Sequence, residues 1–137
     1  MITSLKFFIN AVNTRTRGVD FVANYTMDAL RVNAAASFYD HSIEGQINTP
    51  SVLAAAGADI FDRKEQSRIL SARPNQKIIL GGSYNFNPVT VGVSGTYFGE
   101  VTWQHASDPT LDQTFSGKPI FDLNASYAIN NQVSLSL

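Results

Sequence analysis

Hydrophobic and polar residues alternate along most of this chain with the two-residue period of a β-strand. Over residues 30–38 every second residue is apolar, and the residues between them are mainly polar or small. Because successive side chains of a strand point to opposite faces, this pattern indicates a sheet with one apolar and one polar face. It predicts seven strands, at about 4–13, 17–27, 30–41, 75–86, 89–103, 118–128 and 132–137.

The connections between these strands alternate in length. Short turns fall at residues 27–29, 87–88 and 130–131, where Asp, Asn and Pro supply turn chemistry. Long connections cover about 42–74 and 104–117, and a brief link near 13–17 belongs with them by order. Short helices are predicted at 51–56, with Ser51 as cap, and at 62–68. The expected fold is all-β, an antiparallel up-and-down meander of about seven strands.

Three features favour a transmembrane β-barrel over a soluble β-sandwich. Several predicted strands reach ten residues or more, whereas globular strands have about 5–6 and tilted membrane-spanning strands about 9–11. The polar face carries Asn, Ser, Thr and Gly more than Lys and Glu, which suits a wet lumen. Short turns on one side, long loops on the other and aromatics before the short turns are typical of outer-membrane barrels.

Composition excludes several other classes of protein. The 137 residues carry 10 Lys+Arg against 11 Asp+Glu, so there is no basic excess for nucleic acid. The absence of Cys excludes disulfides, thiolate metal sites and a Cys nucleophile. The longest unbroken apolar run, 52–56, is far shorter than the roughly 20 residues of a transmembrane helix. The first six residues do not resemble a secretory signal, so an exported protein is expected to carry its signal upstream.

Four stretches, in order along the chain, resemble the TonB-dependent outer-membrane receptors. Residues 10–20 look like the family's late-barrel signature, an Asn-Ala strand end followed by an Arg-x-x-Gly-[Val/Leu]-[Glu/Asp] strand start. Residues 49–63 resemble a long extracellular loop, and residues 97–101 resemble the Tyr-Gly-Glu strand end. Residues 120–127 with 133–137 resemble the penultimate hairpin. No single motif is specific, and the resemblance depends on their succession over nearly the whole chain.

The resemblance implies that the chain is a fragment, roughly strands 15 to 21 of a 22-stranded barrel, without the plug, the TonB box and the last strand. Seven strands would leave two unpaired edges, which a barrel in lipid cannot tolerate. The expected partners are therefore outer-membrane lipid, the remainder of the same barrel and its plug domain. The implied function is TonB-energised uptake of a scarce small molecule, such as a ferric siderophore or another metal chelate, at the bacterial outer membrane.

Few side chains stand out as candidates for a site. Arg63, Lys64 and Arg68 could bind an anionic ligand, although a solvated loop with internal ion pairs explains the same run of mixed charges. The only histidines, His41 and His105, lie near the long connections. A metal site needs several converging ligands, so no metal and no cofactor is predicted.

An enzyme is not expected, because neither a Gly-x-Ser-x-Gly elbow nor a triad spacing is present. The charges of the polar face are expected to pair across the wall rather than to catalyse; they are Asp20, Arg31, Lys77, Glu100 and Asp122. Two alternatives to the receptor stay open. One is a passive, porin-like barrel segment, and the other is a soluble β-sandwich or lipocalin-like binding module.

Overall fold

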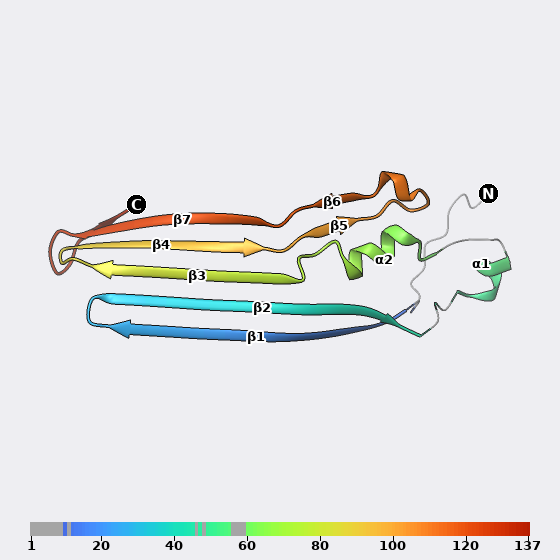
Figure 1. The fold of residues 1–137 in the computed structure, drawn as a ribbon, viewed down its shortest axis with the longest axis horizontal. Helices are drawn as coiled ribbons and strands as arrows, with labels where there is room; N and C mark the ends of the chain where they lie inside the picture. The colour runs from blue at the N-terminus through green and yellow to red at the C-terminus, as the bar shows by residue number, and fades with distance from the viewer. Residues whose placement is uncertain (1–9, 11, 46, 48, 56–59) are drawn as a thin grey trace.

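An antiparallel sheet of six strands dominates the computed structural model, which describes residues 10, 12–45, 47, 49–55 and 60–137 (Figure 1). The strand order is β1-β2-β3-β4-β7-β8, so neighbours in the sheet follow one another along the chain. Only β5 (Val101–Trp103) and β6 (Gln113–Phe115) leave it, and they pair with each other. The other strands are β1 (Asn13–Met27), β2 (Leu30–Glu44), β3 (Gln76–Asn85), β4 (Val89–Phe98), β7 (Lys118–Ala128) and β8 (Ser134–Ser136). The predicted all-β antiparallel meander is confirmed.

Several predicted boundaries need correction: residues 113–115, expected in a loop, form β6, and the predicted strand 132–137 shortens to β8. Residues 13–17, expected as a link, form the first part of β1 and pair with residues 40–44 of β2. The ladder continues there because β-branched Thr and extended Arg suit a strand even where apolar residues are absent. The predicted strand 89–103 is divided after β4, where the backbone N–H of Gly99 donates to Gln76 O. The predicted strand 4–13 lies almost wholly outside the described residues.

The short turns lie together at one end of the sheet, which we call the turn end (Figure 1). Between β1 and β2 the backbone of Asp28 takes a positive φ of 49°, which Asp tolerates better than most residues. Before β4 the side chain of Asn85 accepts a hydrogen bond from the N–H of Asn87 at 2.8 Å. Before β8 Asn130 Oδ1 accepts from the N–H groups of Gln132 and Val133. Local Asx turns therefore close the hairpins before β4 and β8.

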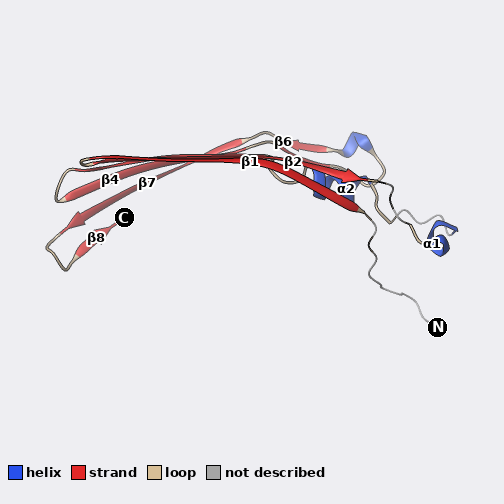
Figure 2. Ribbon diagram, turned by 90° about the horizontal axis from the view of Figure 1, so that it is seen from below, coloured by secondary structure: helices blue, strands red, loops and turns tan. Residues whose placement is uncertain are grey.

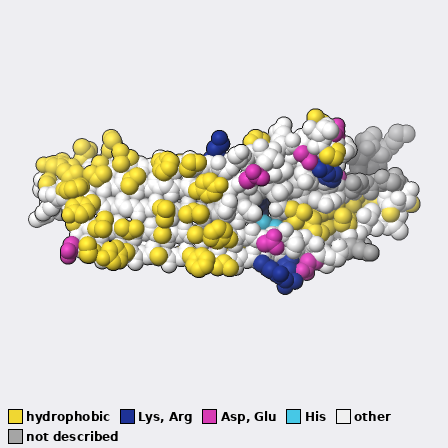
Figure 3. Space-filling model, in the orientation of Figure 1, with side chains coloured by type: hydrophobic (Ala, Val, Ile, Leu, Met, Phe, Trp, Pro, Cys, Tyr) yellow, Lys and Arg dark blue, Asp and Glu magenta, His cyan; other side chains and the backbone are white. Residues whose placement is uncertain are grey.

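The register places the apolar positions of all the strands on one face. Along the middle of the sheet, one row of paired residues consists of Ala23, Ala34, Leu80, Gly95 and Phe121. Figure 3 shows this face as a band of hydrophobic side chains, with most of the visible charges beyond it. On β1 the band covers residues 19–27, which span roughly 27 Å at about 3.3 Å per residue.

The sheet is a single curved layer (Figure 2). No hydrophobic residue among the described residues is buried, and Phe121 and Leu123 are 74% and 77% exposed. Soluble domains normally bury the apolar face of a sheet against a second layer. Within the described part of the chain, nothing covers the apolar face of this one.

Helices and short strands gather at the opposite end, which we call the loop end (Figure 1). They are α1 (Ser51–Ala55), α2 (Arg63–Leu70) and the 3₁₀ helix η1 (Pro109–Leu111). Ser51 is the first residue of α1 rather than its cap, and Pro50 O accepts from Leu53 N–H. Neither α-helix in the described ranges has the length and apolar character needed to cross a membrane.

Candidate functional site

The loop cluster, defined as α2, β5, η1 and β6 with their connections, is fastened together by side chains. Ser67 of α2 is 1% exposed, and its hydroxyl donates to Lys64 O at 2.9 Å. The same oxygen accepts the backbone N–H of Gln104 at 3.3 Å. Ser71 and Thr102 form a reciprocal pair, in which Ser71 Oγ donates to Thr102 O and Thr102 N–H donates to Ser71 O, both at 2.8 Å. The C-terminal turn of α2 is thereby docked on β5.

An ion pair joins the two long connections of the chain. Arg63 Nη2 lies 2.6 Å from Asp112 Oδ2, and the two side chains are only 34% and 23% exposed. Arg63 also donates to His105 O at 3.3 Å, and His105 N–H donates to Asp112 Oδ1 at 2.9 Å. The hydrogen bond from Arg63, followed by that from the His105 backbone, lowers the pKa of the Asp112 carboxyl below its ordinary value.

The three predicted ligand-binding residues lie on α2. Arg63 is engaged with Asp112, and Arg68 donates to both carboxylate oxygens of Glu65 at 2.8 and 3.0 Å. Lys64 follows Arg63 on the same helix and is partly exposed. Internal ion pairs are therefore present for two of the three residues, and their role in ligand binding stays a prediction.

Both histidines take part in local hydrogen bonds. His41 Nδ1 lies 2.9 Å from Thr16 Oγ1, across the β1–β2 ladder. His105 Nδ1 accepts the backbone N–H of Asp108 at 3.1 Å. The hydroxyl and N–H of Thr110 lower the pKa of the Asp108 carboxyl. In the part of the chain that the structure describes, no group of three metal-ligating side chains converges.

A polar pocket of about 670 Å³ opens at the loop end, between the end of α2 and the starts of β3 and β7. It brings one cation, Arg73, and one carboxylate, Glu100, to the same hollow. Sequence reasoning did not identify this pocket, because its residues come from three separate segments that only the sheet register brings together. Its lining is Leu70, Ser71, Arg73, Asn75, Gln76, Tyr97, Glu100, Thr102, Ser116 and Gly117.

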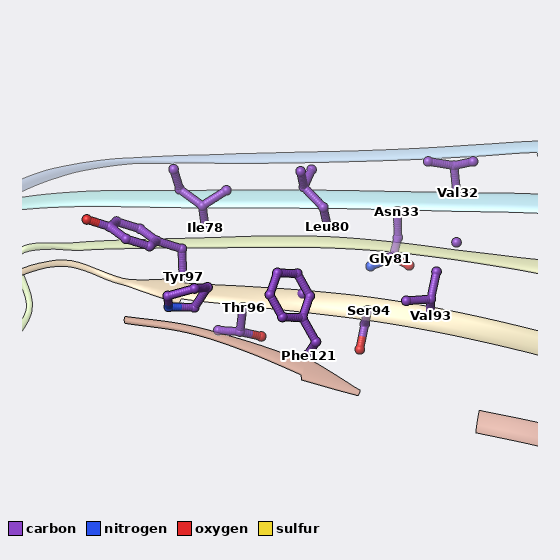
Figure 4. A pocket seen from close by; sticks show the side chains of 13 residues that line it. Val32, Asn33, Ile78, Leu80, Gly81, Val93, Ser94, Thr96, Tyr97 and Phe121 are labelled. Atoms are coloured by element: carbon purple, nitrogen blue, oxygen red, sulfur yellow. The ribbon is translucent and has the colours of Figure 1, made fainter. Parts of the chain in front are cut away.

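A second hollow, of about 490 Å³, lies on the apolar face (Figure 4). It exists because Gly82 and Gly95 contribute no side chains between Leu80, Val93 and Phe121. A Cβ placed on Gly95 would lie 3.1 Å from Phe121 Cε1, so the ring covers the glycine closely. No charged residue lines the hollow, so it could hold an apolar group but has no charged group to bind or transform a ligand.

The predicted pairing of charges across the polar face is wrong for the five residues named above. Among the described residues, no two of those five form an ion pair. The register explains this, because Asp20 lies opposite Ser37 and Asp122 opposite Ser94. Asp20 instead accepts the hydroxyl of Tyr39 at 2.8 Å.

Comparison with known proteins gives no family: no protein-family model matches this sequence, and no curated protein matches it.

Proposed function

We propose that this chain is part of the wall of a transmembrane β-barrel in the bacterial outer membrane, with its loop end outside and its turn end in the periplasm. One observation carries the proposal: a continuous, exposed apolar face about nine residues high lies opposite a polar face. A monomeric soluble protein rarely exposes more than a few hundred Å² of contiguous apolar surface. Lipid would cover such a face, and a wet lumen would solvate the other.

The limits of the apolar band support this placement. Towards the loop end, the apolar band stops after the cross-strand pair Val19 and Phe38. The next pair on the same face, Arg17 and Asp40, is charged. At the turn end the band finishes in aromatic residues, which are Tyr25, Tyr84, Phe86 and Tyr127. The rings of Tyr84 and Phe86 lie 4.6 Å apart. Aromatic rings favour the boundary between lipid and water, so they would mark the periplasmic interface.

The unpaired edges of the sheet fit a partial barrel. The outer edge of β1 has no partner strand among the described residues, and β8 is only three residues long. In lipid each edge would need another strand, because unsatisfied backbone groups cost several kcal/mol. We propose that the remainder of the same 22-stranded barrel supplies these strands.

Within this class, the resemblance to TonB-dependent receptors favours uptake of a scarce small molecule over passive diffusion. The loop cluster supports a receptor in one respect: its own hydrogen bonds give it a defined shape, as recognition requires. The plug domain and TonB would be partners, and a metal chelate such as a ferric siderophore would be the cargo. Uptake that continues in cells without TonB would contradict the receptor and leave the porin-like barrel.

The face assignment can be tested by site-specific labelling, since the chain has no native Cys. Leu123→Cys and Asn124→Cys are adjacent on β7 but lie on opposite faces. Each variant is made in the complete barrel, which carries a fluorescent label in phospholipid vesicles and is quenched by iodide or by a nitroxide on the acyl chains. We expect the nitroxide to quench the label at 123 and iodide to quench the label at 124. Equal quenching at both sites would contradict the proposal, as would cooperative thermal unfolding in buffer without lipid or detergent.

A further inference from the structure

One row of side chains on the polar face, at the loop end of the sheet, places two cations on either side of an aromatic ring. The row crosses five strands and consists of Asp20, Ser37, Lys77, Phe98 and Lys118. Lys77 and Lys118 are the direct neighbours of Phe98 on its two sides. Lys77 Nζ lies 5.3 Å from the centre of the Phe98 ring.

No carboxylate of the described residues forms an ion pair with either lysine. Asp20, in the same row, already accepts hydrogen bonds from the Ser37 and Tyr39 hydroxyls. Asp122 lies on the strand of Lys118, four residues on, which puts the two Cα atoms about 13 Å apart. Both lysines are exposed and have no paired anion among the described residues, so their ammonium groups are available to an anionic ligand on the polar face.

We infer that Lys77, Phe98 and Lys118 form a binding site for a polycarboxylate that carries a planar ring. The lysines are two strands apart, so their Cα atoms are separated by roughly 10 Å. Both flexible side chains can therefore reach carboxylates on one ligand, while the half-buried Phe98 ring offers a flat apolar surface.

This inference rests on the proposed function only in taking the polar face as the wall of the lumen. The labelling at positions 123 and 124 tests the wall and does not involve the three site residues. The two hypotheses can therefore fail separately.

The test uses benzene-1,3,5-tricarboxylate as the probe, with the complete barrel that contains this chain in phospholipid vesicles and calorimetry to measure Kd. We expect Lys77→Gln and Lys118→Gln each to weaken binding about threefold, as for exposed charge pairs. Together they should weaken it about tenfold. Arg17→Gln is the matched control, since it removes one charge from the apolar-face side of β1 at the same end, and it should leave Kd unchanged.

The contribution of the ring is tested with cyclohexane-1,3,5-tricarboxylate, which has the same charge without a planar ring. The wild-type chain should prefer the aromatic probe about threefold, and Phe98→Leu should abolish that preference. Circular dichroism confirms that each variant keeps its strand content. Absence of binding at millimolar probe would overturn the inference. So would a loss in Arg17→Gln equal to that in the lysine variants, since it would show only a general charge effect.

Discussion

The sheet and the loop cluster are stabilised by different means, although one chain forms both. In the sheet, regular backbone ladders hold the strands together, and the large apolar side chains stay exposed. In the loop cluster, particular side chains make the contacts, such as buried Ser67 and the ion pair between Arg63 and Asp112. The sheet thus depends on what surrounds it, whereas the loop cluster carries its own stabilising contacts.

This difference teaches where sequence variation should be tolerated. A residue of the sheet needs only the polarity that suits the face on which it lies, so many side chains of that type should be tolerated. A residue of the loop cluster must reach one particular partner atom, so few other side chains can replace it. Substitutions at paired positions can therefore separate these two requirements.

The largest effect is expected from a charge placed in the middle of the apolar band. Leu123→Arg should destabilise the proposed complete barrel in lipid by about 2–4 kcal/mol, because the guanidinium would enter hydrocarbon. Asn124→Arg, one residue further on the polar face, should change stability by less than about 0.5 kcal/mol. Unfolding by guanidinium chloride in vesicles measures both. If both substitutions lowered the free energy of unfolding equally, the two faces of the sheet would lie in the same environment, contrary to the proposal.

The next effect belongs to Ser67. Ser67→Ala removes the acceptor of the Gln104 N–H in a buried position, which costs about 1–3 kcal/mol. Hydrogen exchange at the Ser71 N–H, which donates to Ser67 O, reports the loosening of α2. The exposed Ser107→Ala is the control and should leave that exchange unchanged.

Comparing the effect of Ser67→Ala in detergent and in lipid vesicles distinguishes the loop cluster from the sheet. Because the loop cluster carries its own contacts, the loss in Ser67→Ala should be the same in detergent as in vesicles. An effect that appears only in vesicles would show that the loop cluster also depends on its surroundings.

Local signals predicted much of the sheet. The strand 118–128 coincides with β7, and the turn residues Asp28, Asn87 and Asn130 lie where hairpins close. Alternation and turn chemistry are properties of neighbouring residues, so one sequence suffices to detect them. The extension of β1 through 13–17 was missed because its partner in β2 supplies the ladder where the apolar pattern has ended.

The loop cluster could be predicted only in outline. The helical tendency of 62–68 is local, and the charges of Arg63 and Arg68 are visible in the sequence. The partner of Arg63 is 49 residues away, and no sequence pattern distinguishes Asp112 from its neighbours. The polar pocket and the row of Lys77, Phe98 and Lys118 likewise depend on the register between strands, which sets contacts that a single strand does not reveal.

A smaller effect is expected at the start of α2, where Asp62 caps the helix. Its Oδ1 accepts the N–H of Glu65 at 2.9 Å, so Asp62→Ala should destabilise α2 by about 1 kcal/mol. Hydrogen exchange of the amides in the last turn of α2 measures the change. Asp62→Asn keeps an acceptor and should behave almost as the wild type; if Asn and Ala were equally disruptive, the side-chain cap would not be the cause.

The smallest effect is the pH dependence of the link between the two long connections. Arg63 and the His105 N–H lower the pKa of Asp112 in the folded chain. The stability that the ionised Asp112 carboxylate adds to the folded loop cluster is therefore complete above the ordinary carboxyl pKa of 3.8. It is lost as the pH falls through the lower, folded-state pKa. Nitroxide labels at Leu70→Cys and Thr110→Cys, on either side of the link, should show a distance distribution that broadens below about pH 3.8.

Asp112→Asn separates this titration from other acid effects. The amide keeps an oxygen that can accept hydrogen bonds but has no charge to attract Arg63. The distribution between the two labels should therefore be broader than in the wild type at neutral pH and should change little on acidification. If the asparagine variant broadened over the same pH range as the wild type, another group would control the link, and the loop cluster would hold without the charge of Asp112.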